Sequence, residues 1–129
     1  MQDRVRFEMA NIKQTRLKME KLINKNGEVA VLYSPEYGAG WVTWNVRYPQ
    51  MVFEREMVEA VLESERLCLG DEAKIEKLLP VAERLFPGAY LGGINGLRVD
   101  WVRQGSVFKI SEFDGREAIE YLGFDAFCA

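Results

Sequence analysis

The sequence predicts an α+β fold, in which two or three helices pack on a small, mainly antiparallel sheet with a C-terminal β-hairpin. One observation is the helical spacing of apolar residues over residues 4–25, 50–66 and 75–86. The other is the last third of the chain, where apolar and polar residues alternate between turn dipeptides. A length of 129 residues without an internal linker predicts a single domain over residues 1–129.

Residues 1–25 are expected to form a basic N-terminal helix that can be separated from the remaining fold. Residues 1–26 carry seven basic and three acidic side chains. Since the whole chain has a net charge of −3, residues 27–129 carry a net charge of −7. Two interpretations stay open: the helix contacts an anionic partner, or it packs against the chain's own acidic body.

The central part of the chain predicts a strand, a long loop and two helical segments. Residues 28–33 are apolar and β-favouring, so they predict a buried strand that ends before Pro35. Residues 34–50 read as a long loop, with a short strand expected at 41–46. Helices are expected over 50–66 and again after Gly70, where Pro80 predicts a kink or two short helices.

The C-terminal third predicts paired strands. Residues 97–103 and 107–113 are expected to form a β-hairpin through the tight turn Gln104-Gly105. A second turn, Asp114-Gly115, precedes residues 117–122, which are either a third short strand or a terminal helix.

The composition excludes several classes of protein. The chain has no histidine, which excludes Ser-His-Asp and Cys-His catalysis and zinc sites with imidazole ligands. Its two cysteines are too few for a disulfide framework and are expected to be reduced thiols in a cytoplasm. No apolar run approaches the roughly 20 residues of a membrane-spanning helix. We therefore expect no catalytic residues, no metal, no cofactor and no membrane contact.

The densest candidate site is the loop between the first strand and the first central helix. It combines aromatic side chains that could stack on a ligand, two glycines that permit close approach, and one carboxylate that could accept hydrogen bonds. The alternative is that the rings fill the core, with Trp41 and Trp44 split between core and groove. The predicted binding residues of this loop are Tyr33, Glu36, Tyr37, Gly38, Gly40, Trp41, Trp44 and Asn45.

Two further segments could carry chemistry. Residues 90–96 contain Gly92 and Gly93, whose amide groups could form an anion-binding nest, unless the segment is a plain connector. Residues 112–117 contain three carboxylates that could bind a cation or act as an acid/base pair, unless they form a solvated turn.

The sequence blocks YSPEYGAGW, YLGG, LRVDWV and FKISEFDG together resemble a family of small proteins encoded by phages and prophages. The resemblance covers roughly residues 28–120, and the helix over residues 1–25 departs from it. It implies a location in the host-cell cytoplasm and a binding role directed at the host. It supplies no catalytic residues.

These observations favour a non-enzymatic phage protein that inhibits or sequesters a host defence component, either a host protein or a small nucleotide signal. Direct nucleic-acid binding is not expected, because no glycine and aromatic residues are interleaved with the basic ones. One alternative is a carboxylate- or metal-dependent enzyme acting on a sugar or nucleotide through Glu36, Glu112 and Asp114. A second is a structural phage accessory protein held together as a homo-oligomer.

Overall fold

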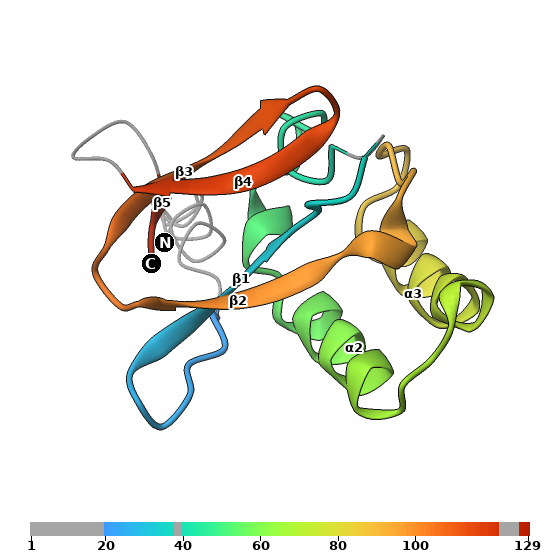
Figure 1. Ribbon diagram of the computed structural model, residues 1–129, viewed down its shortest axis with the longest axis horizontal. Helices are drawn as coiled ribbons and strands as arrows, with labels where there is room; N and C mark the ends of the chain where they lie inside the picture. Colours follow the sequence, from blue (N-terminus) through green and yellow to red (C-terminus); the bar gives the residue numbers. More distant parts are fainter. Residues whose placement is uncertain (1–19, 38–39, 122–126) are drawn as a thin grey trace, which may run out of the picture.

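The computed structural model describes residues 20–37, 40–121 and 127–129, and it confirms the α+β class (Figure 1). Two α-helices and two small antiparallel sheets make up the described part of the chain. In chain order the elements are β1 (Glu28–Tyr33), the 3-10 helix η1 (Pro49–Val52), α2 (Arg55–Arg66), α3 (Asp71–Leu85), the 3-10 helix η2 (Ile94–Gly96), β2 (Arg98–Arg103), β3 (Val107–Phe113), β4 (Arg116–Tyr121) and β5 (Phe127–Cys128).

Strand β1 pairs with β2, which corrects the predicted hairpin between residues 97–103 and 107–113. The two strands run antiparallel, with Glu28 opposite Arg103 and Tyr33 opposite Arg98. Ser106 N–H donates to Arg103 O across the turn after β2, but the two amides inside the turn bond to other segments: Gln104 N–H donates to Gly27 O, and Gly105 N–H donates to Ala129 O. Strands β2 and β3 therefore belong to different sheets.

The C-terminal hairpin is formed instead by β3 and β4, and β5 pairs with the other edge of β3. Asp114 and Gly115 connect the hairpin, and both have positive φ, at 56° and 81°. Two such residues in succession are typical of the hairpin turns that match the right-handed twist of strands. Of the two predictions for residues 117–122, the strand is therefore correct over residues 117–121, and residue 122 lies outside the described residues.

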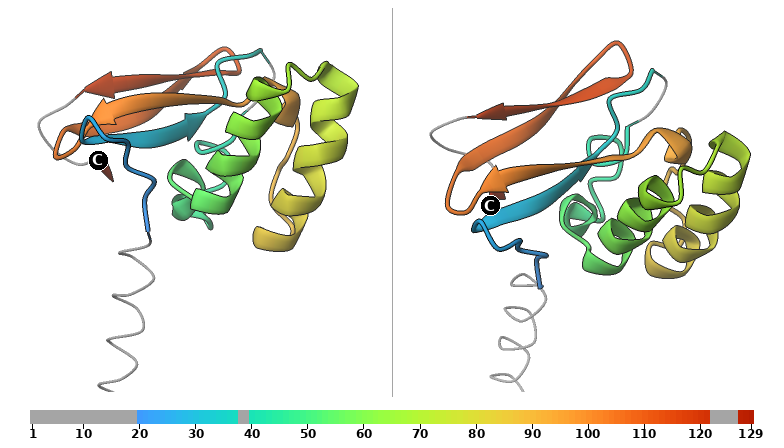
Figure 2. Two further views of the ribbon diagram at one scale, coloured as in Figure 1. Left: turned by 90° about the horizontal axis from the view of Figure 1, so that it is seen from below. Right: turned by 60° about the horizontal axis from the view of Figure 1, so that its bottom comes forward.

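The two helices lie side by side: α2 packs against β1 and β2, and α3 packs against α2 and η2 (Figure 2). Helix α2 begins at Arg55 and not at residue 50, because the Glu54 side chain accepts hydrogen bonds from the amides of Glu56 and Met57. Helix α3 is continuous through Pro80, so the predicted division into two helices is wrong. Pro80 is exposed, whereas Leu78 and Ala82 on either side of it are buried and hold both turns against the core.

The first described residues belong to the fold. The predicted helix over residues 1–25 lies largely outside the described residues, and residues 20–25 are not helical. Leu22 O accepts a hydrogen bond from Ala30 N–H, and Lys21 Nζ donates to Cys128 O at 2.7 Å. Lys21 also lies 4.4 Å from the centre of the Phe53 ring. A chain that begins at Asn26 would lose these contacts.

The core is centred on β1, whose residues Val29 to Leu32 are fully buried. A cluster of three rings joins the end of η1 to the second sheet, with centroids 5.6–6.1 Å apart; its members are Phe53, Phe108 and Phe127. Trp101 is half-buried against this core, and Val102 is the most deeply buried residue of β2. Among the described residues, no helix is both long and apolar enough to cross a membrane.

Candidate functional site

A buried carboxylate fixes the loop that follows β1. Glu117 of β4 is 2% exposed. Its Oε1 accepts a hydrogen bond from Ser34 N–H at 2.9 Å, and its Oε2 accepts from Val42 N–H and Thr43 N–H at 2.8 Å and from Thr43 Oγ1 at 2.9 Å. The Glu117 amide also donates to Ser34 O. One side chain thus binds both ends of the loop. The four donors also compensate the burial of the carboxylate, since a buried charge needs several hydrogen bonds. The segment 41–44 forms turns, so the strand expected there is absent.

Asn45 joins this loop to the second glycine-rich segment. Its side chain is buried; Nδ2 donates to Trp41 O at 2.8 Å and to Tyr90 O at 3.0 Å. Its Oδ1 accepts from Tyr90 N–H at 2.7 Å. The predicted binding residue Asn45 is therefore a bridge that positions the backbone of Tyr90. The two loops that the sequence singled out separately form one surface.

This surface presents two aromatic rings that contact each other. The rings of Trp44 and Tyr90 are tilted, with centroids 4.9 Å apart, and both side chains are about two-fifths exposed. Each ring lies against a glycine: a Cβ atom at Gly40 would overlap the Trp44 indole, and one at Gly92 would overlap the Tyr90 ring. We call the hollow around them the Trp44 surface. Its volume is about 230 Å³, and it is lined by Trp44, Asn45, Val46, Arg47, Tyr48, Gly88, Ala89 and Tyr90.

Trp41 and Trp44 are split as the sequence suggested. Trp41 is 2% exposed, donates its Nε1 hydrogen to Met51 O at 2.9 Å, and packs edge-on against Phe86 at 5.9 Å. It is a core residue and cannot contact a ligand directly. Trp44, by contrast, is available to a partner.

The other predicted binding residues have different positions. Tyr37 is 68% exposed, and the Arg116 guanidinium lies 5.9 Å from its ring centre. Gly93 has a positive φ of 76° before η2, which explains the glycine structurally. Gly38 lies outside the described residues.

Tyr33 is a core residue with a defined polar partner. It is 7% exposed, and its hydroxyl donates to Asp100 Oδ2 at 2.7 Å. Burial, assisted by the hydrogen bond to Asp100, raises the pKa of Tyr33 to about 12. The phenol thus serves the pairing of β1 with β2 rather than the Trp44 surface.

We expect this contact to make stability depend on alkaline pH. Tyr33 ionises near its ordinary pKa of 10.0 in the unfolded chain and at about 12 in the folded protein. The stability that the neutral phenol contributes is therefore complete below pH 10 and is lost as the pH rises toward 12. Urea unfolding across this range should show a steeper loss for the wild type than for Tyr33→Phe. Equal slopes would contradict the assignment.

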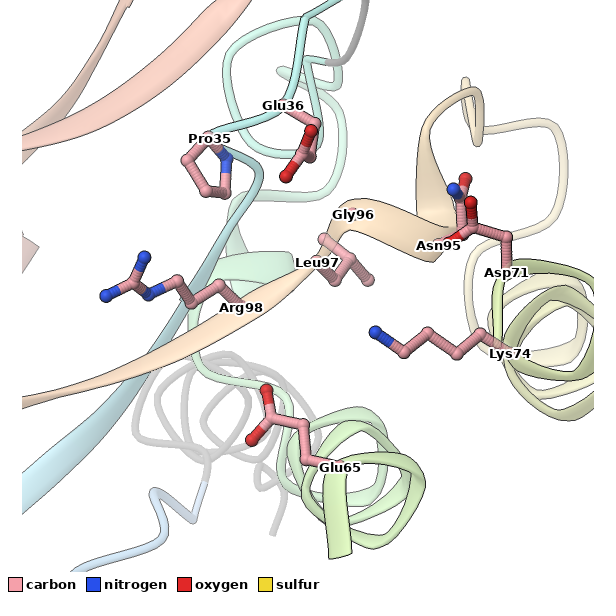
Figure 3. A pocket seen from close by; sticks show the side chains of 9 residues that line it. All are labelled: Pro35, Glu36, Glu65, Asp71, Lys74, Asn95, Gly96, Leu97 and Arg98. Atoms are coloured by element: carbon pink, nitrogen blue, oxygen red, sulfur yellow. The ribbon is translucent and has the colours of Figure 1, made fainter. Parts of the chain in front are cut away.

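Glu36 lies in a second, charged cleft of about 420 Å³ (Figure 3). The cleft is bounded by the segment after β1, the end of α2, the start of α3 and the start of β2; its lining residues are Pro35, Glu36, Glu65, Asp71, Lys74, Asn95, Gly96, Leu97 and Arg98. Figure 3 shows the Lys74 side chain extending into it from α3, whereas the Arg98 guanidinium points away. Arg98 pairs with Asp100 at 3.3 Å. Glu36 packs over Gly96, where a Cβ atom would overlap its side chain.

The carboxylates proposed for an enzyme do not share this cleft. Neither Glu112 nor Asp114 is among the residues that line it. Glu112 accepts a hydrogen bond from Gly115 N–H at 2.8 Å within the β3–β4 turn. Glu117, the third carboxylate of that segment, accepts hydrogen bonds from the loop after β1. Across the described part of the chain, no group of three or more His, Cys, Asp or Glu residues could hold a metal ion.

Sequence reasoning found Trp44 but missed most of its surroundings. Tyr90 and Val46 are exposed and apolar, and a signal existed for Tyr90 because it opens the glycine-rich segment. Arg47 and Tyr48 follow the aromatic block directly, yet nothing in their spacing marks them. The role of Glu117 had no sequence signal, because one glutamate in an acidic turn resembles its solvated neighbours.

Comparisons of the chain with protein-family models, with curated proteins and with solved structures find no match.

Proposed function

We propose that this chain is a non-enzymatic binding protein that inhibits or sequesters a host defence protein through the Trp44 surface. The observation that carries the proposal is the pair of exposed rings, Trp44 and Tyr90, on a backbone that Asn45 holds in place. Tryptophan, tyrosine and arginine dominate the binding energy of many protein interfaces. A surface that is already ordered loses little conformational freedom on binding.

A protein partner fits this surface better than a nucleotide does. The hollow has a volume of about 230 Å³. Small-molecule sites are more often enclosed clefts of roughly 300–1,000 Å³ that bury most of the ligand. An open aromatic hollow can instead receive one side chain from a larger interface.

The host-directed part of the proposal comes from the resemblance to phage and prophage proteins. A protein that acts on the host during infection would meet its partner in the host-cell cytoplasm, where reduced cysteines are expected. Cys68 and Cys128 are both unpaired and exposed, which is compatible with that compartment.

The proposal is tested with Trp44→Ala. The tagged chain is recovered from infected host cells, the co-purifying protein is identified and purified, and its affinity is measured by calorimetry. We expect Trp44→Ala to weaken binding about 30-fold or more, as for a central aromatic anchor, and to leave the unfolding free energy nearly unchanged.

Tyr121→Ala is the matched control, because Tyr121 is an exposed aromatic residue (63%) on β4 that does not line the Trp44 surface. It should bind normally. Equal binding by Trp44→Ala and the wild type would contradict the proposed function.

A further inference from the structure

We propose that the Trp44 surface recognises an acidic peptide segment of its partner, with an apolar side chain on the two rings and a neighbouring carboxylate on Arg47. This inference rests on the proposed function, since it names the chemistry of the protein that the surface binds. It follows from four features of the hollow: the lack of a carboxylate partner for Arg47 among the described residues, the charge of the lining, the exposed apolar groups and the indole N–H of Trp44.

Arg47 is an exposed guanidinium without a carboxylate partner among the described residues. Four other described arginines are paired: Arg55 with Glu59, Arg66 with Glu63, Arg84 with Glu56 and Arg98 with Asp100. Arg103 and Arg116, like Arg47, have no carboxylate partner among the described residues, but they do not line the hollow. A guanidinium offers a planar fork of donors that matches the two oxygens of a carboxylate. Arg47 thus retains a binding capacity that those four have already used.

The guanidinium is also held in place. It lies 5.5 Å from the ring centre of Tyr48, and that ring is fixed by Phe86 at 5.5 Å and by a hydrogen bond from the Tyr48 hydroxyl to Pro87 O at 2.6 Å. Stacking on an aromatic ring restricts a long side chain that would otherwise lose entropy on binding. The carboxylate site is therefore largely formed before the partner arrives.

The lining of the hollow selects the sign of the charge. Among the described residues that line it, Arg47 is the only charged one, and none has a carboxylate. A partner carboxylate would gain a charged hydrogen bond there, whereas a lysine or arginine would be desolvated without a counter-charge.

The rest of the hollow suits an apolar side chain and a peptide backbone. Trp44 is 43%, Tyr90 41% and Val46 83% exposed, so burial of these groups by a partner removes apolar area from water. The indole Nε1 of Trp44 makes no hydrogen bond with any described residue and can donate to a peptide carbonyl.

A nucleic acid is a poorer occupant than an acidic peptide, although its phosphates are also anionic. Tight binding to nucleic acid depends on several Lys or Arg contacts to the backbone. The hollow supplies one, and residues 27–129 carry a net charge of −7 that repels a polyanion. A short peptide brings a single carboxylate and an apolar group together without a run of negative charge.

The experiment uses a random peptide library displayed on yeast, sorted for binding to the full-length purified chain. We expect the recovered sequences to carry Asp or Glu close to a large apolar residue. One recovered peptide is then synthesised, and its affinity is measured by fluorescence anisotropy. Arg47→Glu should weaken binding at least about tenfold, and Arg47→Lys should weaken it less, because lysine keeps the charge but not the fork.

Lys25→Glu is the matched control, because it also replaces a positive by a negative side chain, at an exposed residue outside the hollow. It should leave the affinity within about twofold. Replacing the peptide's carboxylate by the corresponding amide should reproduce the loss caused by Arg47→Glu. Adding a single-stranded thymidine oligonucleotide should not displace the peptide.

Each contrary result overturns the inference. Recovery of no peptides, recovered sequences without acidic residues, equal affinity for Arg47→Glu, or displacement by the oligonucleotide would each do so. Peptides that need Trp44 but not Arg47 would overturn the acidic preference alone and leave the proposed function in place. The proposed function fails separately, when Trp44→Ala retains the host protein.

Discussion

Replacement of Glu117 by alanine should lower the free energy of unfolding by about 4 kcal/mol, the largest effect expected of a single polar side chain in this protein. The change removes an acceptor of four hydrogen bonds and leaves the amides of Ser34 and Val42 buried without partners. Each unsatisfied buried group costs roughly 1–3 kcal/mol. Glu117 has no ion pair with any described residue. The backbone amides and the Thr43 hydroxyl are therefore the described groups that offset the cost of burying its carboxylate.

Urea unfolding monitored by circular dichroism measures this effect. Glu117→Gln should lose about half as much, since one acceptor oxygen remains while the new NH₂ group faces amide donors. Glu120→Ala is the control: Glu120 lies on the same strand and is exposed, so its removal should change stability by less than about 0.5 kcal/mol. A Glu117→Ala protein within about 1 kcal/mol of the wild type would show that the loop is held by other contacts.

Trp41→Ala should cost about 3–5 kcal/mol, as for other large buried aromatic residues reduced to alanine. The substitution leaves a cavity beside Phe86 and deprives Met51 O of its hydrogen bond. Trp41→Phe should cost less, because it keeps most of the ring and loses only the indole donor.

Trp44→Ala provides the comparison within the same loop. Trp44 is 43% exposed and rests on Gly40 and Tyr90, so its removal should cost less than about 1 kcal/mol. Equal losses for the two tryptophan variants, measured by the same urea unfolding, would contradict the division between core and surface. Near-ultraviolet circular dichroism should lose its tryptophan signal mainly in the Trp41 variant.

The sequence predicted elements better than it predicted their partners. Strand β1 occupies residues 28–33, as expected, because a β-branched apolar run before a proline leaves few alternatives. The pairing of β2 was wrong because alternation and a turn dipeptide indicate that strands exist, and not which edge they join. The choice was decided by β1, a fully buried strand whose backbone groups need a partner.

The candidate site was predicted in part for a similar reason. The density of aromatic residues singled out the loop, and the burial of Trp41 and exposure of Trp44 fit the predicted division of the two tryptophans. Asn45 and Glu117 act across 45 and up to 83 positions of sequence, respectively. Such long-range contacts leave no local pattern, so only the folded chain reveals that the two glycine-rich segments form one surface.

The pairing of β1 with β2 also sets the order in which the chain can fold. The hydrogen bond between Tyr33 and Asp100 spans 67 positions, whereas the β3–β4 hairpin and the α2–α3 pair are local. Local units form within microseconds, whereas closing a long loop costs conformational entropy before the contacts between its two ends can form. We therefore expect β1 to stay unpaired during folding until β2 reaches it. The segment EVAVLY is apolar and β-favouring, and such strands join one another when they are unpaired. Refolding yield should consequently fall as protein concentration rises, because unpaired β1 strands of different molecules associate. In the native protein this same strand is buried.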